Sequence, residues 1–300
     1  MTNQKANATS PDLPDFDKLW DYNKPTATEK AFCEILPTAR SSGNEAYLAE
    51  LLTQIARTQG LQRQFDQAHA TLDEVEAMID DSMPVPRIRL LLERGRTLNS
   101  SNQPDQAKPL FQLAWELARQ EGEEFHAVDA AHMLGIVEPD DASLQWNEIA
   151  IKLAEQSADA RAIHWLGPLY NNTGWTYHGM ERYDDALGMF EKSLAFQQAE
   201  QDEKLIRIAM WTIARTLRSL DRVEEALAKQ GELLEVFKVA GTKDGYVYEE
   251  IAECLLLLDQ ADEAREYFAL AHAELSQDPW LEANESVRLV RLKRLGSRGK

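Results

Sequence analysis

Cysteine and long apolar runs are both scarce in this 300-residue chain. There are two cysteines, Cys33 and Cys254, and both lie in helical patterns among apolar residues. Two cysteines cannot build a disulfide framework, which indicates a reducing compartment. The most apolar stretch, Cys254 to Leu258, is too short to cross a bilayer. The polar start, Met1 to Lys5, leads into no apolar run, so no secretory signal is expected. These absences predict a cytoplasmic protein.

Positive charge is also in short supply. Lysine and arginine total 32 against 51 aspartates and glutamates, which gives a formal net charge of −19. Nucleic-acid affinity depends on clustered cations, so this balance argues against a phosphate backbone as partner. Most of the acidic residues are expected to form a solvated outer face.

Sequence motifs of common catalytic and cofactor-binding sites are missing. The sequence has no glycine-rich phosphate-binding loop, no Gly-x-Ser-x-Gly elbow and no Cys-x-x-Cys pair. Among its six histidines, the nearest approach to a metal-ligand pattern is His126, Asp129 and His132. Their spacing of i, i+3, i+6 places the outer two poorly on one helix face, which favours histidines satisfied within a core or a groove. We therefore expect no metal, no cofactor and no enzymatic activity.

The chain does contain a repeat of about 39 to 40 residues. A short pattern with one or two acidic residues ends each time in alanine, at Ala68, Ala107, Ala186, Ala226 and Ala264. The spacings are 39, 79, 40 and 38, so one degenerate copy lies within the gap of 79. The acidic residues before each alanine suit a helix N-terminus.

Other positions keep step with these anchor alanines. Twelve residues earlier all side chains are small: Ala56, Gly95, Gly174, Ala214 and Ala252. Sixteen residues earlier all are large and apolar: Leu52, Leu91, Tyr170, Met210 and Tyr248. Four residues later come Leu72, Phe111, Phe190, Gln230 and Phe268, where only Gln230 is polar. Small residues where two helices touch and bulky ones between hairpins predict a stack of helical hairpins.

The segment from Tyr170 to Tyr177, followed by Ala186 and Phe190, resembles the tetratricopeptide-repeat consensus. The match covers roughly residues 46–275, with units about five residues longer than the usual length of about 34. Such longer units are similar to those of kinesin light chains and of bacterial peptide-sensing regulators. The resemblance implies an all-α fold: a right-handed superhelical solenoid of antiparallel helix hairpins, with about six repeats plus capping helices.

The repeat predicts the organisation of the whole chain. Residues 1–25 are expected to be a flexible tail, mobile up to about Leu13, with Leu19 to Tyr22 as a candidate for pinning it to the first hairpin. Thr26 and Glu29 have the spacing of a capping box. A single solenoid is expected over 26–296. Its parts are a half-repeat at 26–42, repeats at about 46–82, 86–122, 126–158 (degenerate), 162–200, 204–240 and 244–276, and a capping helix at 279–295.

The first helices of stacked hairpins line the concave face of a solenoid. Residues fifteen, eleven and eight before each anchor alanine share one helix face and are expected to point there. The resemblance to kinesin light chains adds the pair Asn171 and Asn172, which in that family holds the backbone of a bound peptide. The predicted groove residues are Arg57, Arg96, Asn99, His132, Asn171, Asn172, Trp175, His178, Trp211, Arg215, Arg218, Glu249 and Glu253.

Arginine and tryptophan are enriched at binding hot spots, and arginine takes carboxylates bidentately. The groove is therefore predicted to bind an extended or helical peptide with acidic or C-terminal carboxylate character. Glu249 and Glu253 would favour a basic residue at one end. In the alternative interpretation, the arginines pair with neighbouring acids along the inner wall.

Three functions remain open from the sequence. The first is an adaptor or scaffold that binds a protein segment in the concave groove. The second is a peptide-responsive regulatory protein, and the third is a structural subunit bound through the convex face. The partner and the oligomeric state are not indicated by the sequence, and a membrane is not expected among the partners.

Overall fold

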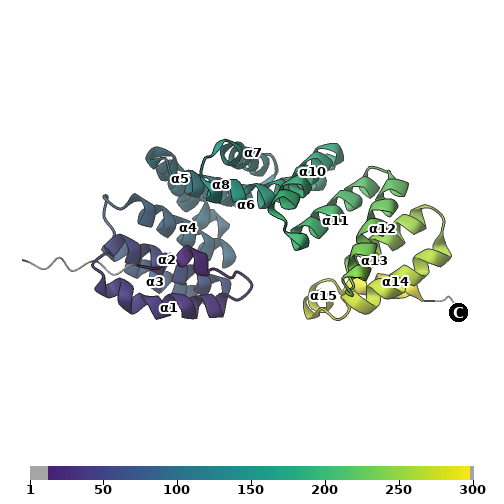
Figure 1. The fold of residues 1–300 in the computed structure, drawn as a ribbon, viewed down its shortest axis with the longest axis horizontal. Helices are drawn as coiled ribbons and strands as arrows, with labels where there is room; N and C mark the ends of the chain where they lie inside the picture. The colour runs from purple at the N-terminus through teal and green to yellow at the C-terminus, as the bar shows by residue number, and fades with distance from the viewer. Residues whose placement is uncertain (1–12, 298–300) are drawn as a thin grey trace, which may run out of the picture. The chain divides into compact units, whose positions relative to one another are not determined.

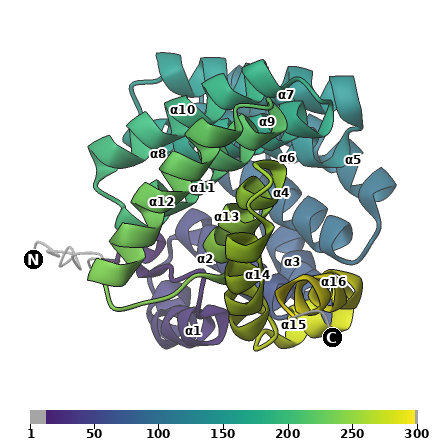
Figure 2. The same ribbon diagram turned by 90° about the vertical axis from the view of Figure 1, so that its right-hand side faces the viewer.

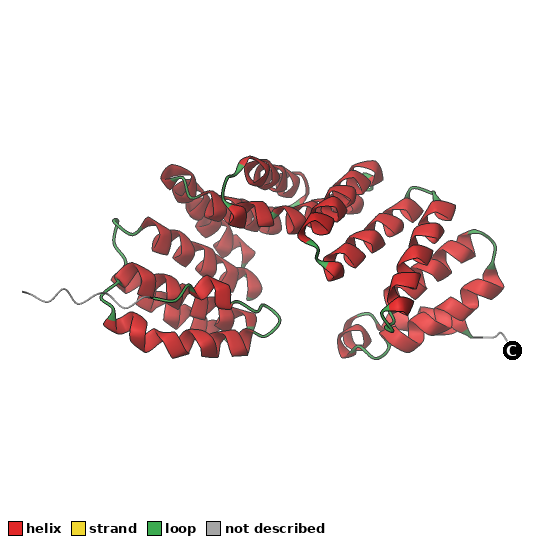
Figure 3. Ribbon diagram, in the orientation of Figure 1, coloured by secondary structure: helices red, strands yellow, loops and turns green. Residues whose placement is uncertain are grey.

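The computed structural model describes residues 13–297 of the chain. These residues contain helices and no strand (Figure 3), which confirms the predicted all-α class. They form two compact units that divide between Trp165 and Leu166. We refer to residues 13–165 as unit 1 and to residues 166–297 as unit 2. That both belong to one domain stays a prediction, and the expected mobility of residues 1–12 lies outside the described residues.

Unit 1 begins with one 3-10 helix and continues with eight α-helices (Figure 1). Their bounds are η1 (Phe16–Leu19), α1 (Pro25–Ser41), α2 (Glu45–Leu61), α3 (Phe65–Met78), α4 (Pro84–Ser100), α5 (Pro104–Glu121), α6 (Glu124–Val137), α7 (Asp140–Gln156) and α8 (Ala160–His164). Helices α2 and α3, α4 and α5, and α6 and α7 pack as hairpins.

Unit 2 contains the remaining eight helices. Their bounds are α9 (Leu166–Gly179), α10 (Tyr183–Glu200), α11 (Glu203–Ser219), α12 (Val223–Val239), α13 (Gly245–Leu257), α14 (Ala261–Leu275), α15 (Pro279–Asn284) and α16 (Ser286–Gly296). Helices α9 and α10, α11 and α12, and α13 and α14 pack as hairpins. The six hairpins agree with the predicted number of about six repeats.

The residues in step with the anchor alanines form the hairpin contacts. All five anchor alanines are buried, and so are the residues four positions later. A methyl group added at Gly95 would lie 2.4 Å from the ring of Phe111, and one at Gly174 would lie 2.6 Å from the ring of Phe190. In these two repeats the aromatic ring of the second helix therefore rests directly on the backbone of the first helix, where a β-carbon would have no room.

Five hairpins share one tight turn. Its left-handed residues are Arg63, Asn102, Glu181, Asp221 and Asp259, with φ between 59° and 63°. In each turn the next amide donates to the carbonyl oxygen five residues back, for example Gln64 to Gln59 and Arg222 to Leu217, at 2.9–3.0 Å. The acidic residues of the repeat lie in the first turn of the second helix, but no side chain caps those helices. These acidic residues interact favourably with the helix dipole but do not cap the helix. The expectation that they suit a helix N-terminus therefore holds for the dipole and not for capping.

The degenerate copy at 126–158 has its own turn. Its loop consists of Glu138 and Pro139, both in extended conformation, so it is one residue shorter than the loops of the other five hairpins. Gly135 is the small contact: an added methyl group would lie 2.6 Å from the Asn147 side chain. The Ser143 hydroxyl donates to the Gly135 carbonyl at 2.5 Å and so joins α7 to α6.

The first helix of the repeat expected at 162–200 is broken. Helix α8 ends at His164, and α9 begins at Leu166. Pro168 has no amide hydrogen, and its ring would clash with the carbonyl of His164 in a continuous helix. Pro168 therefore favours the break, although Pro37 and Pro109 lie inside the continuous helices α1 and α5.

Both ends differ in detail from the expectations. Helix α1 begins at Pro25, and its N-cap, Lys24, makes no side-chain cap, so the predicted capping box is wrong. Thr26 donates instead to Gln62 at 2.7 Å, and Gln62 donates to Glu29 at 2.6 Å, which ties α1 to α2. The predicted capping helix at 279–295 is interrupted at Glu285 and forms α15 and α16. Helix α16 packs beside α14 (Figure 2).

Each unit has its own apolar core. In unit 1, one cluster surrounds Phe32, Leu51 and Leu72, and a second surrounds Phe111 and Leu134. In unit 2 a cluster around Leu233 and Phe268 continues to Leu281, Leu289 and Leu292 of the last two helices. No helix within residues 13–297 is long and apolar enough to cross a membrane.

Candidate functional site

The predicted groove residues lie on the first helices of the hairpins. Those of unit 1 lie on α2, α4 and α6, and those of unit 2 lie on α9, α11 and α13. We call the faces of these helices that turn away from the second helices the first-helix surface of each unit. On both surfaces, most of the charged residues form ion pairs between successive first helices.

In unit 1 the pairs centre on Glu93 of α4, whose side chain is 4% exposed. Arg57 of α2 donates to Glu93 at 3.0 Å, and Arg96 donates to it at 2.5 Å. Arg96 also binds Asp129 of α6. Burial favours the neutral form of Asp129, but Arg96 and Arg57 outweigh it and hold the pKa of this carboxyl below its usual value. Three first helices are thus joined by charges withdrawn from solvent.

The two other predicted residues of unit 1 differ in exposure. His132 is 7% exposed and lies against the ring of Trp165, 5.0 Å between centroids. Burial lowers the pKa of His132 to about 4, and its Nδ1 has no partner among the described residues. Asn99 is half-buried beside Arg57 and Arg96, at a cavity of about 170 Å³. The structure therefore brings Asn99 and the two arginines together and leaves His132 in the interior.

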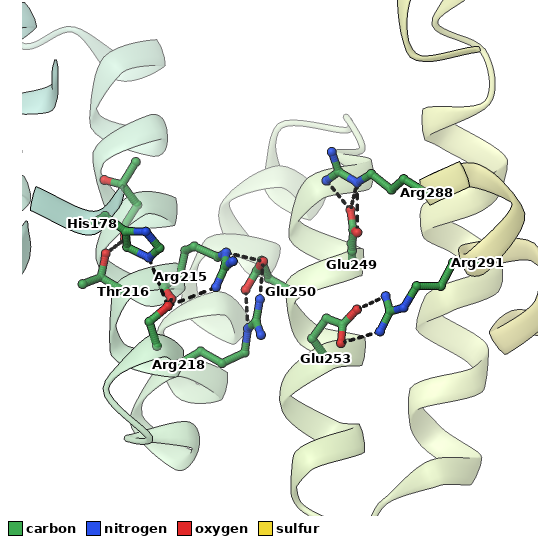
Figure 4. Close-up of polar contacts among 11 residues, drawn as sticks. His178, Arg215, Thr216, Arg218, Glu249, Glu250, Glu253, Arg288 and Arg291 are labelled. Atoms are coloured by element: carbon green, nitrogen blue, oxygen red, sulfur yellow. Dashed lines mark hydrogen bonds and ion pairs between the residues drawn. The ribbon is translucent and has the colours of Figure 1, made fainter. Parts of the chain in front are cut away.

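In unit 2, Arg215 and Arg218 of α11 converge on Glu250 of α13 (Figure 4). Arg218 binds Glu250 bidentately at 2.8 and 3.0 Å, and Arg215 approaches the same carboxylate at 3.2 Å. Burial disfavours the charge of Arg218, but its hydrogen bonds to Glu250 prevail and raise its pKa. The side chain of Arg215 is 29% exposed, so its outer edge still reaches solvent.

The predicted acidic end of the groove is also paired within the chain. Arg288 of α16 binds Glu249 at 3.0 Å through its Nε, and Arg291 binds Glu253 (Figure 4). Arg288 also binds Glu285 at 2.7 Å. Helix α16 thus stands beside α13 as a further first helix would. The two glutamates already have basic partners, which is the arrangement of the alternative interpretation.

Aromatic residues form a row on the first-helix surface of unit 2. The rings of Trp175 and Trp211 lie 6.2 Å apart, and Trp211 and Tyr246 lie at the same distance, 6.2 Å. The guanidinium of Arg288 lies 5.2 Å from the Tyr246 ring and ends the row. Trp175 and Trp211 are half-buried, and Tyr246 is exposed. We call Trp175, Trp211 and Tyr246 the aromatic row.

His178 and the two asparagines flank this row. His178 lies 5.3 Å from Trp175 and 3.0 Å from the Ser219 hydroxyl of α11. Burial, together with Arg215 and Arg218, lowers the pKa of His178. Asn171 donates to Asn172 at 3.4 Å, and both are half-buried on α9.

The sequence-based prediction missed Glu93, Glu250 and the third member of the aromatic row, Tyr246. Glu93 and Glu250 both lie fourteen residues before an anchor alanine, and so does Asn172. The equivalent residues in the other two repeats are Gln54 and Thr212. A polar residue at this position in all five repeats was the signal, because it falls between the apolar residues at sixteen and twelve.

The repeated hairpins make the chain an all-α repeat solenoid, and its fold is that of tetratricopeptide-repeat proteins. The apo form of the quorum sensor NprR from B. thuringiensis is similar with a TM-score of 0.65 at 15% identity, covering 93% of this chain and 79% of that one. The apo form of RapI is similar with a TM-score of 0.67 at 13% identity, covering 88% and 77%.

A signal transduction ATPase with numerous domains from Pyrococcus horikoshii, which has a tetratricopeptide repeat sensor, is similar with a TM-score of 0.69 at 13% identity. The match covers 94% of this chain and 46% of that chain, so this chain spans less than half of that protein. No protein-family model and no curated protein matches the sequence. The predicted resemblance to tetratricopeptide-repeat proteins is confirmed at the level of the fold.

Proposed function

We propose that this protein is a binding module, and not an enzyme, that holds a segment of a partner protein along the first-helix surface of unit 2. The observation that carries the proposal is the aromatic row. Half-exposed tryptophans supply large contact area at low entropic cost and are enriched at binding hot spots. In unit 2 they stand next to each other on successive helices, which suits an extended or helical segment that crosses several repeats.

The chemistry of the partner follows from the residues beside the row. Arg215 contacts Glu250 through Nε and donates through Nη1 to the Ser219 hydroxyl, both at 3.2 Å, while its side chain stays 29% exposed. A carboxylate on the partner, from a side chain or a C-terminus, would meet the exposed part of this guanidinium. We therefore propose a partner segment that combines apolar side chains with acidic character. Unit 1 is left out of this site because its arginines are more buried and His132 lies in the interior.

A peptide-responsive regulator is the second candidate. NprR is a quorum sensor whose structure is also known with its cognate peptide NprX, and that complex is similar to this chain with a TM-score of 0.53 at 16% identity. In such a regulator, a short peptide on the aromatic row would shift the equilibrium between two states. Small-angle scattering with and without bound peptide separates this candidate from a passive adaptor, because only the regulator changes its dimensions.

The test is selection of peptides from a random display library on the full chain, compared with a Trp175→Ala, Trp211→Ala variant. We expect peptides with clustered acidic and apolar residues, and at least a ~10-fold loss of their binding in the variant, about 1.4 kcal/mol or more. A matched control is Val236→Ala, Leu270→Ala, which removes exposed apolar side chains from second helices of the same unit. Equal binding to all three proteins would move the site away from the aromatic row.

A further inference from the structure

The segment before α1 lies on the first-helix surface of unit 1. Apart from the single 3-10 turn η1, it has no regular secondary structure between Leu13 and Lys24. Its contacts reach α1, α2 and α4, up to 72 residues along the chain. It belongs to no hairpin and follows α2 as a bound peptide would. We call residues 14–22 the N-terminal strap.

Hydrogen bonds hold the strap at three points. The Tyr47 hydroxyl donates to the backbone carbonyl of Pro14 at 2.7 Å. Arg89 of α4 grips the Asp17 carboxylate with two donors, at 3.1 and 2.6 Å. The Trp20 indole donates to the Gln54 side chain at 3.1 Å. A main-chain contact, a bidentate carboxylate and a satisfied indole are the elements of specific peptide recognition.

Aromatic contacts add to these bonds. Phe16 is 5% exposed and lies 5.1 Å from the Tyr47 ring and 6.3 Å from the Phe32 ring. The guanidinium of Arg57 lies 5.8 Å from the Trp20 ring and 5.4 Å from the ring of Tyr22. Cation–π contacts of this kind stabilise by about 0.5–2 kcal/mol in proteins.

The surface under the strap uses the same repeat positions as the first-helix surface of unit 2. Gln54 and Arg57 occupy the positions fourteen and eleven before their anchor alanine, and the equivalent residues in the α9 repeat are Asn172 and Trp175. Phe16 reaches the apolar core of unit 1 and Trp20 packs against it, while Lys18 and Leu19 between them face outward, an alternation typical of a docked peptide segment.

From these contacts we propose that the strap is a tethered ligand of the α2–α4 surface. A partner segment with a carboxylate three residues before a tryptophan displaces it and takes its place. This inference concerns unit 1 and is independent of the aromatic row, so the two proposals fail or hold separately. A short tether gives an effective concentration on the order of 1 mM. A free segment that binds the open surface with a Kd of about 10 μM therefore binds the intact chain about 100-fold more weakly.

The experiment uses the full chain and a labelled synthetic peptide of residues 13–24. In the variant Asp17→Ala, Trp20→Ala the strap loses two anchors, and we expect the peptide to bind at least ten-fold more tightly than it binds the wild type. The matched control Lys18→Ala, Leu19→Ala removes outward side chains and should behave as the wild type does. A peptide that itself carries Asp17→Ala and Trp20→Ala should not bind. Absence of binding to the loosened variant, or equal binding to all chains, overturns the proposal.

Hydrogen exchange on the wild type provides a test that needs no variant. The amides of Lys18 and Asp21 are hydrogen-bonded to the Asp15 carbonyl and to the Thr28 hydroxyl. A displaceable strap opens without unfolding its receptor, so these amides should exchange at least ~100-fold faster than the interior amides of α2. Protection equal to that of α2 would make the strap a fixed part of the core and would overturn the proposal.

Discussion

The first-helix surfaces of the two units use the same helix positions in different ways. In unit 1 the polar centre is Glu93, 4% exposed, and part of the surface lies under the N-terminal strap. In unit 2 the corresponding centre is Glu250, 7% exposed, but one of its two arginine partners, Arg215, is 29% exposed beside the aromatic row. The same repeat positions can therefore form either buried ion pairs between helices or a partly solvent-accessible surface, depending on how deeply their side chains are buried.

The largest expected effect compares the two central glutamates. Glu93→Gln removes the carboxylate that pairs with Arg57 and leaves Arg96 with Asp129 alone, and it should lower the free energy of unfolding by about 3–5 kcal/mol. Glu250→Gln should cost less, about 2 kcal/mol, because Arg215 can turn to water. Denaturant titration followed by circular dichroism measures both.

The exposed Glu224→Gln is the control for the glutamate comparison and should change stability little. Equal losses for Glu93→Gln and Glu250→Gln would show that the greater exposure of Arg215 has no effect on stability, and would remove the basis for the comparison of the two units.

The next effect concerns pH and belongs to unit 1. Burial lowers the pKa of both His126 and His132 from 6.5 to about 4. Between these values the unfolded chain binds a proton that the folded chain does not, so stability falls as pH drops from about 6.5 towards 4. Each histidine contributes at most about 3 kcal/mol to this loss.

Thermal melts at pH 7 and pH 5 test the pH effect. His132→Gln should reduce the difference in melting temperature between the two conditions. His272→Gln, on α14 of unit 2, is the matched control. A His132→Gln protein with the wild-type pH dependence would contradict a buried neutral histidine in unit 1.

A smaller effect comes from the one polar residue among the five core positions after the anchor alanines. Gln230 is fully buried, and neither its Nε2 nor its Oε1 has a partner among the described residues. Gln230→Leu removes two unsatisfied groups and should stabilise unit 2 by about 1–3 kcal/mol. Phe111→Gln in unit 1 is the reverse change and should destabilise. A Gln230→Leu protein that melts below the wild type would indicate that the amide has a role in the core.

The smallest effect compares two helix ends. The C-cap residues that follow α5 and α10 are Gly122 and Gln201. Both lie in the left-handed region, with φ of 73° and 59°. A side chain in that conformation costs about 1–2 kcal/mol. Gln201→Gly should therefore stabilise unit 2 by up to about 1 kcal/mol, and Gly122→Ala should destabilise unit 1 by a similar amount. Urea midpoints measure both, and changes of the same sign would contradict this reading of the two turns.

Much of the fold was predictable because the same sequence pattern occurs five times in the chain. The anchor alanines, the small residues and the large residues each recur in register, and all lie at the hairpin contacts. The breaks at Trp165 and Glu285 were missed because each occurs once. Pro168 was visible in the sequence as a local signal, whereas nothing in the periodicity indicates the break at Glu285.

The candidate site was predictable only in part. The helix face that carries Arg57, Trp175 and Arg215 follows from spacing, but their partners lie on other repeats. Glu249 meets Arg288 across 39 residues, and Asp17 meets Arg89 across 72. In a chain with 51 acidic residues, a glutamate that binds an arginine and one that faces water look alike. Only the stacking of the helices distinguishes them.

The contact between ring and glycine has a consequence for how this sequence can evolve. Gly95 with Phe111 and Gly174 with Phe190 each fill one fixed volume between two helices. Where alanine replaces the glycine, the partner is smaller in two of three repeats: Leu72 opposite Ala56 and Gln230 opposite Ala214, against Phe268 opposite Ala252. Positions sixteen residues apart are therefore expected to change together in related chains, with a gain in volume at one matched by a loss at the other.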